Sequence, residues 1–267
     1  MAVVEEIEFG AVRGLRVGRF TSRMNTTCVF YQIGETLIDC GPPNQWRFVR
    51  NFVERYSPKQ VVFTHHHEDH SGNGAEIQQR FNLPLFADPA GIHYYENGYP
   101  IQMYRRIIWG RPRKFRPRPF PPSLSADGQL SLIPIPAPGH SPDMTCFLEA
   151  QNGWLFTGDL FITSRPLYLR MEENPQLEIE SLKNVLRRDF DTLFCAHRGI
   201  VENGKEALRR KLNYLESLRE QVAELTRQGF SRQAITAKLL GRENLMSWLT
   251  GFRFSKKNMI RRLSPHR

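Results

Sequence analysis

Four side chains that can bind a metal ion lie within six residues of one another: His65, His67, Asp69 and His70. They follow the apolar run of residues 61–63, which is β-branched and aromatic and predicts a buried strand ending at Thr64. Alternate side chains of an extended chain point to the same side, so the first three should converge, and the fourth should approach from the following turn. His66 and Glu68 should turn away. Imidazole and carboxylate ligands suit zinc, with iron or manganese as alternatives.

Three later segments offer further ligands of the same kind. Residues 138–143 contain His140, residues 155–159 end a strand-like run at Asp159, and residues 194–199 contain His197. Together with the His-x-His-x-Asp-His run, and in this order, they resemble the motifs of the metallo-β-lactamase superfamily, and in particular its glyoxalase II-like members. The resemblance covers most of the chain. It implies a first metal site of His65, His67 and His140, a second of Asp69, His70 and His197, and a shared Asp159.

The resemblance implies a centre with two divalent metal ions, zinc being preferred over iron or manganese. Ions held about 3.5 to 4 Å apart share a bridging water whose pKa falls toward about 7, and the resulting hydroxide attacks a carbonyl or phosphorus. Asp159 would bridge the ions and Asp69 would orient the nucleophile, so these two are the predicted catalytic residues. Thr64, Ser141 and Asp143 are candidates for hydrogen bonds that fix the imidazole tautomers.

The elements that position these residues alternate between strands and helices. Residues 26–33 and 36–39 predict a β-hairpin, and residues 46–56 predict an amphipathic helix leading to the first metal-binding segment. Further strands are predicted at residues 130–135, 144–150, 154–157 and 192–195, and further helices at residues 75–81 and 179–188. Strands grouped with helices on the outside predict an α/β sandwich of two sheets, which the resemblance identifies as an αββα fold.

The composition shifts toward helix in the last quarter of the chain. Residues 205–228 predict one long helix, and two shorter helices should follow, with N-caps at Ser231 and Ser255. We therefore divide the chain into a catalytic domain of residues 1–203 and a C-terminal helical extension of residues 204–267. A DNA-binding helix-turn-helix is the alternative for this extension, but its apolar helices favour packing on the body.

The net charge of +10 is unevenly distributed along the chain. Seven arginine and lysine side chains lie within residues 105–118, interleaved with aromatic residues and prolines that resist a regular helix or strand. We expect a lid or groove in which Arg111 and Arg113 bind an anionic substrate, with an oligomer contact as the alternative. Arg198, after the predicted ligand His197, is either a third substrate-binding arginine or a surface side chain at the rim.

These features predict a metal-dependent hydrolase that acts on a small, anionic substrate. Residues 157–161 resemble the glyoxalase II neighbourhood and favour an ester, thioester or lactone. The basic segment and Arg198 favour a phosphodiester, so a phosphodiesterase or ribonuclease is the alternative, followed by a nucleic-acid-binding metalloprotein without catalysis. Nucleic acid is the less favoured partner, and a homodimer is compatible with the sequence.

The remaining composition predicts a cytoplasmic protein. No run approaches the roughly 18 to 20 apolar residues of a membrane span, and the acidic N-terminus lacks the build of a secretory signal. The four cysteines are scattered through apolar segments and predict buried free thiols, as is usual in a reducing compartment.

Overall fold

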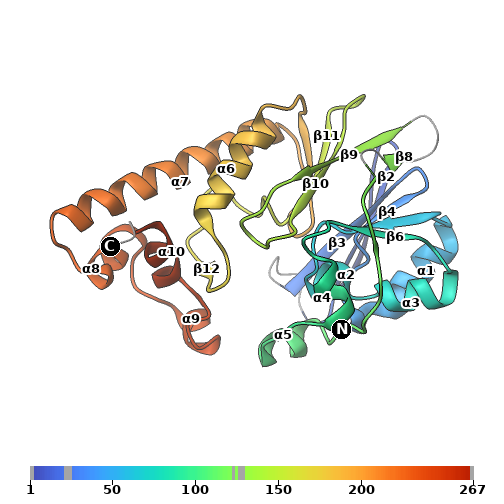
Figure 1. The fold of residues 1–267 in the computed structure, drawn as a ribbon, viewed down its shortest axis with the longest axis horizontal. Helices are drawn as coiled ribbons and strands as arrows, with labels where there is room; N and C mark the ends of the chain where they lie inside the picture. Colours follow the sequence, from blue (N-terminus) through green and yellow to red (C-terminus); the bar gives the residue numbers. More distant parts are fainter. Residues whose placement is uncertain (1–2, 21–25, 122–123, 126–129, 265–267) are drawn as a thin grey trace.

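The computed structural model describes residues 3–20, 26–121, 124–125 and 130–264. Two sheets pack face to face, and helices cover the outer face of each, so the α/β sandwich expected from the sequence is confirmed (Figure 1). The C-terminal helices form an arm at one side of the sandwich.

The first sheet is built from the N-terminal half of the chain. Its strands follow the order of the sequence, antiparallel from β1 to β4 and parallel from β4 to β7. Helix α1 (Trp46–Tyr56) buries Val49, Phe52 and Val53 against the outer face, together with α3 (Gly74–Phe81). The strands are β1 (Val3–Phe9), β2 (Val12–Gly18), β3 (Thr27–Ile33), β4 (Thr36–Ile38), β5 (Gln60–Val62), β6 (Leu85–Ala87) and β7 (Arg118–Pro119).

The second sheet has the order β14-β13-β11-β10-β9-β8 and is covered by α6 (Pro175–Leu186) and α7 (Gly204–Arg227). Its one parallel pairing among the described residues joins β11 to β13, so both strands end at the same edge. The strands are β8 (Leu124–Ser125), β9 (Ser131–Pro136), β10 (Thr145–Glu149), β11 (Trp154–Gly158), β13 (Thr192–Cys195) and β14 (Gly199–Val201).

Aromatic side chains fill the space between the two sheets. Tyr31 of β3 packs edge-on against Phe156 of β11, and Phe156 stacks on Phe194 of β13 at 4.7 Å between ring centroids. Fully burying a side chain of this size stabilises a fold by roughly 1.5 to 3 kcal/mol. This shared core fixes the two sheets relative to each other, and with them the loops at the sheet edge.

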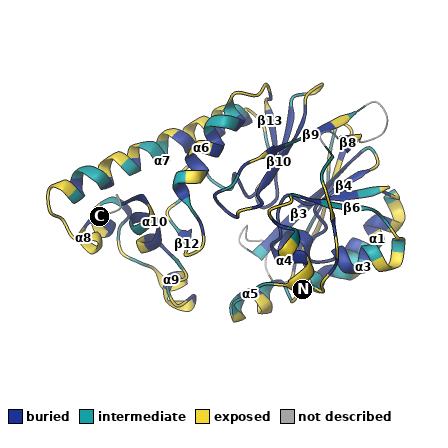
Figure 2. Cartoon of the chain, viewed as in Figure 1, coloured by how far each residue is buried: buried dark blue, intermediate teal, exposed yellow. Residues whose placement is uncertain are grey.

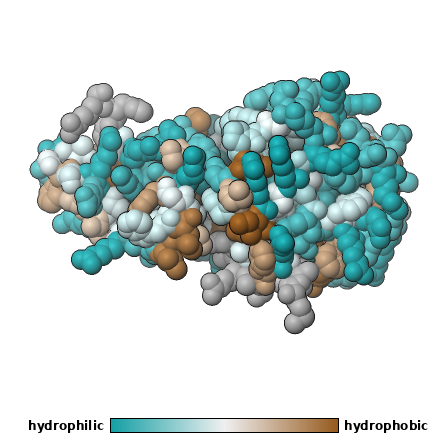
Figure 3. All heavy atoms as spheres, turned by 90° about the horizontal axis from the view of Figure 1, so that it is seen from below, coloured by the Kyte–Doolittle hydropathy of each residue, from teal (hydrophilic) through white to brown (hydrophobic). Residues whose placement is uncertain are grey.

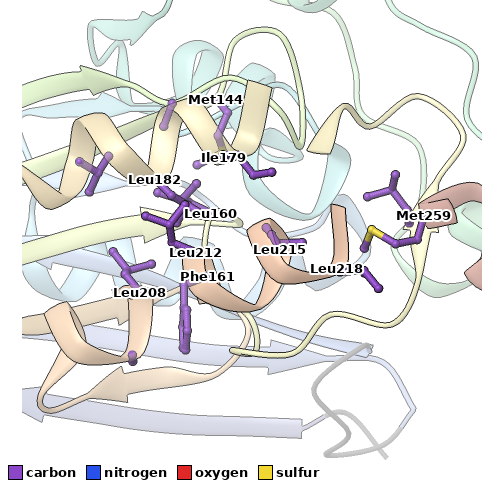
Figure 4. Packing of buried hydrophobic residues seen from close by; sticks show 14 of the residues in the cluster. Met144, Leu160, Phe161, Ile179, Leu182, Leu208, Leu212, Leu215, Leu218 and Met259 are labelled. Carbon is purple, nitrogen blue, oxygen red and sulfur yellow. The ribbon is translucent and has the colours of Figure 1, made fainter. Parts of the chain in front are cut away.

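The C-terminal extension packs on the outer face of the second sheet. Leu208, Leu212 and Leu215 of α7 lie against Ile179 and Leu182 of α6 (Figure 4). In Figure 2 this face of α7 is dark, while its outer face is exposed. The further elements are α8 (Arg232–Leu240), α9 (Leu245–Leu249), α10 (Lys256–Leu263) and a two-stranded sheet of β12 (Leu169–Arg170) and β15 (Phe254–Ser255). The domain boundary after residue 203 stays a prediction.

The structure confirms the predicted helix N-caps but contradicts part of the prediction for residues 105–118. Ser231 and Ser255 accept hydrogen bonds from the backbone N–H groups of Ala234 and Asn258, so both predicted N-caps are confirmed. The prediction that residues 105–118 resist regular structure is wrong at both ends, because the stretch begins within helix α5 (Met103–Ile108) and Arg118 begins strand β7. Two further short helices are α2 (Glu68–Ser71) and α4 (Ile92–Asn97).

Two general predictions can be compared with the structure directly. All four cysteines are buried and free, as expected. Within the described ranges, no helix combines the length and apolar character needed to cross a membrane.

Candidate metal centre

All seven predicted ligands lie together in loops at one edge of the sandwich. His65 and His67 follow β5, Asp69 and His70 lie on α2, and His140 lies between β9 and β10. The other two side chains follow parallel strands: Asp159 after β11 and His197 after β13. Each of the seven is at least nine-tenths buried. The extended geometry expected for residues 65–69 is wrong beyond His67, where α2 begins and turns Asp69 and His70 toward the same point.

The first group consists of three histidine nitrogens that face one another. His67 Nδ1 lies 2.9 Å from His65 Nε2 and 3.0 Å from His140 Nε2. Two ligand atoms bound to one tetrahedral zinc at about 2.0 to 2.1 Å lie roughly 3.3 to 3.4 Å apart. The three nitrogens are therefore close to the spacing that a single ion requires.

The second group joins Asp69, His70 and His197, and Asp159 lies between the two groups. Asp159 Oδ1 is 3.4 Å from His70 Nε2 and 3.2 Å from His197 Nε2, whereas its Oδ2 is 3.2 Å from His140 Nε2. One carboxylate oxygen thus faces each group. This is the geometry that a bridging carboxylate needs, although the ligand assignment itself stays a prediction.

Several possible metal-binding atoms at the centre make no hydrogen bond to any other described residue. Both carboxylate oxygens of Asp69, one of Asp159 and Nε2 of His70 are buried without a hydrogen-bond partner in the part of the chain that the structure describes. A buried polar atom without a partner costs about 1 to 3 kcal/mol, and more when it is charged. Four such atoms at one point indicate a bound group of opposite charge.

Hydrogen bonds from other segments orient three of the histidines. His70 Nδ1 lies 2.8 Å from Asp39 Oδ2, and His140 Nδ1 lies 2.8 Å from Glu173 Oε1. The backbone carbonyl of Thr27 lies 2.7 Å from His197 Nδ1. An Nδ1 proton donated to these acceptors leaves the lone pair on Nε2, which faces the centre.

Of the three residues predicted to orient the histidine ligands, one contacts a predicted ligand and two do not. Thr64 Oγ1 lies 3.1 Å from His65 Nδ1 and also donates to Asp39, so it does contact the ligand set. Asp143 instead binds His66, at 2.8 Å from Nδ1, and Ser141 Oγ has no partner within the described residues. Asp39 and Glu173 were not predicted, because each lies far along the chain from the histidine that it orients.

Burial and neighbouring charges set the ionisation states of the predicted ligands: His65, His67, Asp69 and Asp159 already suit a cation. His70 and His197, whose pKa values the carboxylates raise, must release a proton before they bind a cation. Burial lowers the pKa of His65 and His67 well below its usual range, so both keep a free lone pair near pH 7. Burial alone would raise the pKa of Asp69 and Asp159, but the adjacent histidines outweigh it and hold both pKa values low. Burial would lower the pKa of His70, yet Asp159 and the other carboxylates raise it to about 10.

His66 and Glu68 turn away from the metal centre, as expected, but neither reaches solvent. Glu68 forms a two-point ion pair with Arg105 of α5, at 2.6 Å to Nε and 2.7 Å to Nη2, and accepts from the Tyr99 hydroxyl. Among the cations of residues 105–118, Arg105 is therefore set apart: it is only 3% exposed and holds the ligand loop.

A guanidinium does lie at the centre, but it belongs to a residue that sequence analysis missed. Arg170 of β12 is partly buried, and its Nη1 is 3.3 Å from His67 Nδ1. The same loop carries Glu173, which accepts a hydrogen bond from the Arg170 backbone N–H at 2.8 Å. No local motif surrounds Arg170, so only the fold could reveal its position.

Within the described residues, no hydrogen bond or ion pair joins the side chains of the three predicted substrate-binding arginines to a predicted ligand. Arg111 and Arg113 line a cavity of about 580 Å³ with His66, but no predicted ligand lines it, and Arg113 also lies 3.6 Å from Glu76. Arg198 is exposed, and its backbone N–H donates to Cys195 Sγ. Their role in substrate binding stays a prediction.

Several curated proteins are similar in sequence. A probable metallo-hydrolase of Bacillus subtilis, YybB, is 27% identical over 151 residues, which cover 54% of this chain and 65% of that protein. A hydroxyacylglutathione hydrolase of Serratia proteamaculans is 26% identical, over 71% of this chain and 68% of that protein. Another, of Xanthomonas axonopodis pv. citri, is 30% identical, over 57% of this chain and 51% of that protein. The match thus spans less than two thirds of the Bacillus and Xanthomonas relatives.

Solved structures show the same fold, and a family profile covers most of the chain. A metallo-beta-lactamase family protein from Thermus thermophilus superposes with a TM-score of 0.68 at 14% identity, over 97% of this chain and 91% of the other. A beta-lactamase domain protein from Burkholderia ambifaria gives 0.69 at 18% identity, over 97% and 87%. The profile that matches residues 25–212 contains all seven converging side chains, and on this ground the chain belongs to the metallo-beta-lactamase superfamily.

Proposed function

We propose that the protein is a metal-dependent hydrolase that cleaves a small ester, thioester or lactone. The observation that carries the proposal is the convergence of seven buried histidine and aspartate side chains, several with unpartnered atoms facing one point. Two divalent ions, zinc being preferred, fit this donor set. Divalent ions supply Lewis acidity and acidify water, which is the chemistry that acyl hydrolysis needs.

The protein's own residues hold this centre in one geometry. Asp159 presents one oxygen to each group and would bridge two ions, and Asp69, ionised at neutral pH, would accept a proton or orient the attacking water. Asp39 and Glu173 keep their histidines aligned, so the site needs little rearrangement on substrate binding.

Arg170 is the residue best placed to hold the substrate. Its guanidinium lies beside the first group, where it can donate hydrogen bonds to a carbonyl or carboxylate oxygen. Replacing Arg170 by Met should leave metal content unchanged and raise KM or lower kcat at least tenfold. Arg170→Lys should recover part of the loss, because the charge remains while the planar fork is lost.

The surroundings of the centre favour an acyl substrate over a nucleic acid. Helix α5, tied to the ligand loop by Arg105, exposes the apolar side chains of Met103 and Ile107. Leu245, Trp248 and Leu249 of α9 are exposed as well, and Figure 3 shows hydrophobic side chains gathered over both helices on one face. Such surfaces suit an ester or thioester with an apolar part, in keeping with the hydroxyacylglutathione hydrolases among the relatives.

A phosphodiesterase is the second candidate, and one observation favours it. The cavity lined by Arg111 and Arg113 is also lined by Lys114 and Tyr94, a mixture of cations and aromatic groups that suits a phosphate backbone.

A cytoplasmic location belongs to the main proposal and is supported by the four buried free thiols.

Metal analysis and a substrate panel test the proposal together. Protein purified without an affinity tag should contain about two metal ions per chain and turn over a thioester or lactone faster than bis-p-nitrophenyl phosphate. Asp159→Ala should lower the metal content and abolish turnover. Full metal content and turnover in that variant would refute the assigned centre, and preferred cleavage of the phosphodiester would select the second candidate.

A further inference from the structure

A second cavity lies beside the C-terminal helices and is lined by none of the predicted ligands. It has a volume of about 480 Å³, and its only charged side chains among the described residues are arginines. The lining residues are Met171, Asn174, Gln176, Arg232, Arg261 and Arg262.

Separate elements bring these arginines to one cavity. Arg232 begins α8, whereas Arg261 and Arg262 lie in the last turn of α10, which packs against α6, α8 and β12. Met171 directly follows β12, and Asn174 is the N-cap of α6. The arginines are therefore held by tertiary packing, because α8 and α10 are separate helices.

The two acidic residues between Met171 and Asn174 in the chain are engaged elsewhere. Glu172 turns toward Arg105, at 4.0 Å, and Glu173 binds His140. None of the three cavity arginines has a carboxylate within 4.0 Å in the described part of the chain. Arg262 donates to the backbone carbonyl of Met171, whereas Arg261 Nε is buried without a hydrogen-bond partner. This one buried donor without an acceptor leaves a cost that an anionic ligand would remove, and the exposed Arg232 and Arg262 could donate further hydrogen bonds to it.

We propose that this cavity binds the phosphate group of a small molecule. A carboxylate has two oxygens and suits one guanidinium, whereas a phosphate has three peripheral oxygens and can accept from several arginines at once. The cavity is larger than one phosphate and falls in the usual range for small ligands, so it has room for an attached group. Its lining comes from a few side chains on separate elements, which favours a small molecule over a nucleic acid. This site does not depend on the proposed hydrolase activity.

Calorimetric titration of the metal-loaded, full-length protein tests the site. The probe is phenylphosphonate, a phosphate-ester analogue that cannot be hydrolysed, with acetate as the carboxylate comparison. The double variant R261Q/R262Q should weaken phenylphosphonate binding at least tenfold, and Arg232→Gln, at an exposed position less important for folding, should weaken it several-fold. Lys257→Gln is the matched control, because it removes one positive charge from α10 outside the cavity and should change affinity less than twofold.

Two readouts separate this site from the metal centre and from general electrostatics. Metal content, measured by elemental analysis, should be equal in all variants, so that a loss of binding cannot come from the metals. Unchanged affinity in both arginine variants, or an equal loss in Lys257→Gln, would overturn the proposal. So would equally tight, arginine-dependent binding of acetate or of a DNA duplex.

Discussion

Replacing Asp39 by Asn should weaken metal binding while leaving the ligand set intact. Asp39 Oδ2 accepts from His70, and its Oδ1 accepts from the Thr64 backbone N–H at 2.8 Å. Asn has one acceptor oxygen, so one of these two donors must face the amide NH₂ group. Losing one charge-assisted hydrogen bond costs about 1.5 to 3 kcal/mol, and 1.4 kcal/mol is a factor of ten. We therefore expect an affinity about 10- to 100-fold lower, as is usual for residues that orient metal ligands.

The chain supplies a matched control in Asp143. This carboxylate makes equivalent contacts, at 2.8 Å to His66 Nδ1 and 2.9 Å to the His66 backbone N–H, but His66 is not a predicted ligand. Asp39 has a φ of 61°, which asparagine tolerates well, so D39N tests the carboxylate and not the backbone. Affinity is measured by competition with a chromophoric chelator. Equal losses in D39N and D143N, or an unchanged affinity in D39N, would refute the reasoning.

Three further predictions concern stability and pH. Arg105→Ala leaves the buried Glu68 with the Tyr99 hydroxyl but with no cation to neutralise it, and should lower the free energy of unfolding by about 3 to 5 kcal/mol. Arg116→Ala, at a mostly exposed pair, should cost about 0 to 1 kcal/mol in the same denaturant titration. Lys211→Met removes the buried contacts of α7 to Glu178 and the Leu160 carbonyl, and should lower the melting temperature and expose α7 to limited proteolysis. Because carboxylates raise the pKa of His70 to about 10, metal and proton compete for it, so metal affinity should increase with pH between about 7 and 10 and binding should release protons. Calorimetry in two buffers of different ionisation enthalpy detects that release, and its absence would contradict the assignment of His70 as a ligand.

The convergence of the predicted ligands could be expected from the sequence, because the residues that indicate it are close together in the chain or lie at the ends of strands. Four candidate side chains occupy six consecutive residues, and the others follow short apolar strands whose ends meet at one sheet edge. The helices at residues 46–56 and 204–227 could also be predicted, because each presents one apolar face over several turns. The amphipathic periodicity of the helices and the ends of the apolar strands therefore predicted most of the elements that position the site.

The partners of the ligands could not be predicted, because they depend on contacts between distant segments. Asp39 lies 31 residues before His70, and nothing in its own neighbourhood indicates a histidine partner. Arg105 belongs to a cluster of cations that the sequence alone cannot divide into exposed and buried members. Its burial follows from Glu68, which α2 turns into the protein interior, where an unpaired carboxylate would be costly.

The pairing of β12 with β15 connects the C-terminal extension to the loop that carries Arg170 beside the candidate metal centre. Arg170 lies opposite Phe254 in this small sheet, where the Met171 backbone N–H donates to the Arg253 carbonyl, and the same loop continues to Glu173 beside His140. A substitution or insertion around residue 254 would displace Arg170 and Glu173 without altering any metal ligand. A change at this distant position could therefore alter both the proposed substrate contact of Arg170 and the alignment of His140, although it lies outside the loops that carry the predicted ligands.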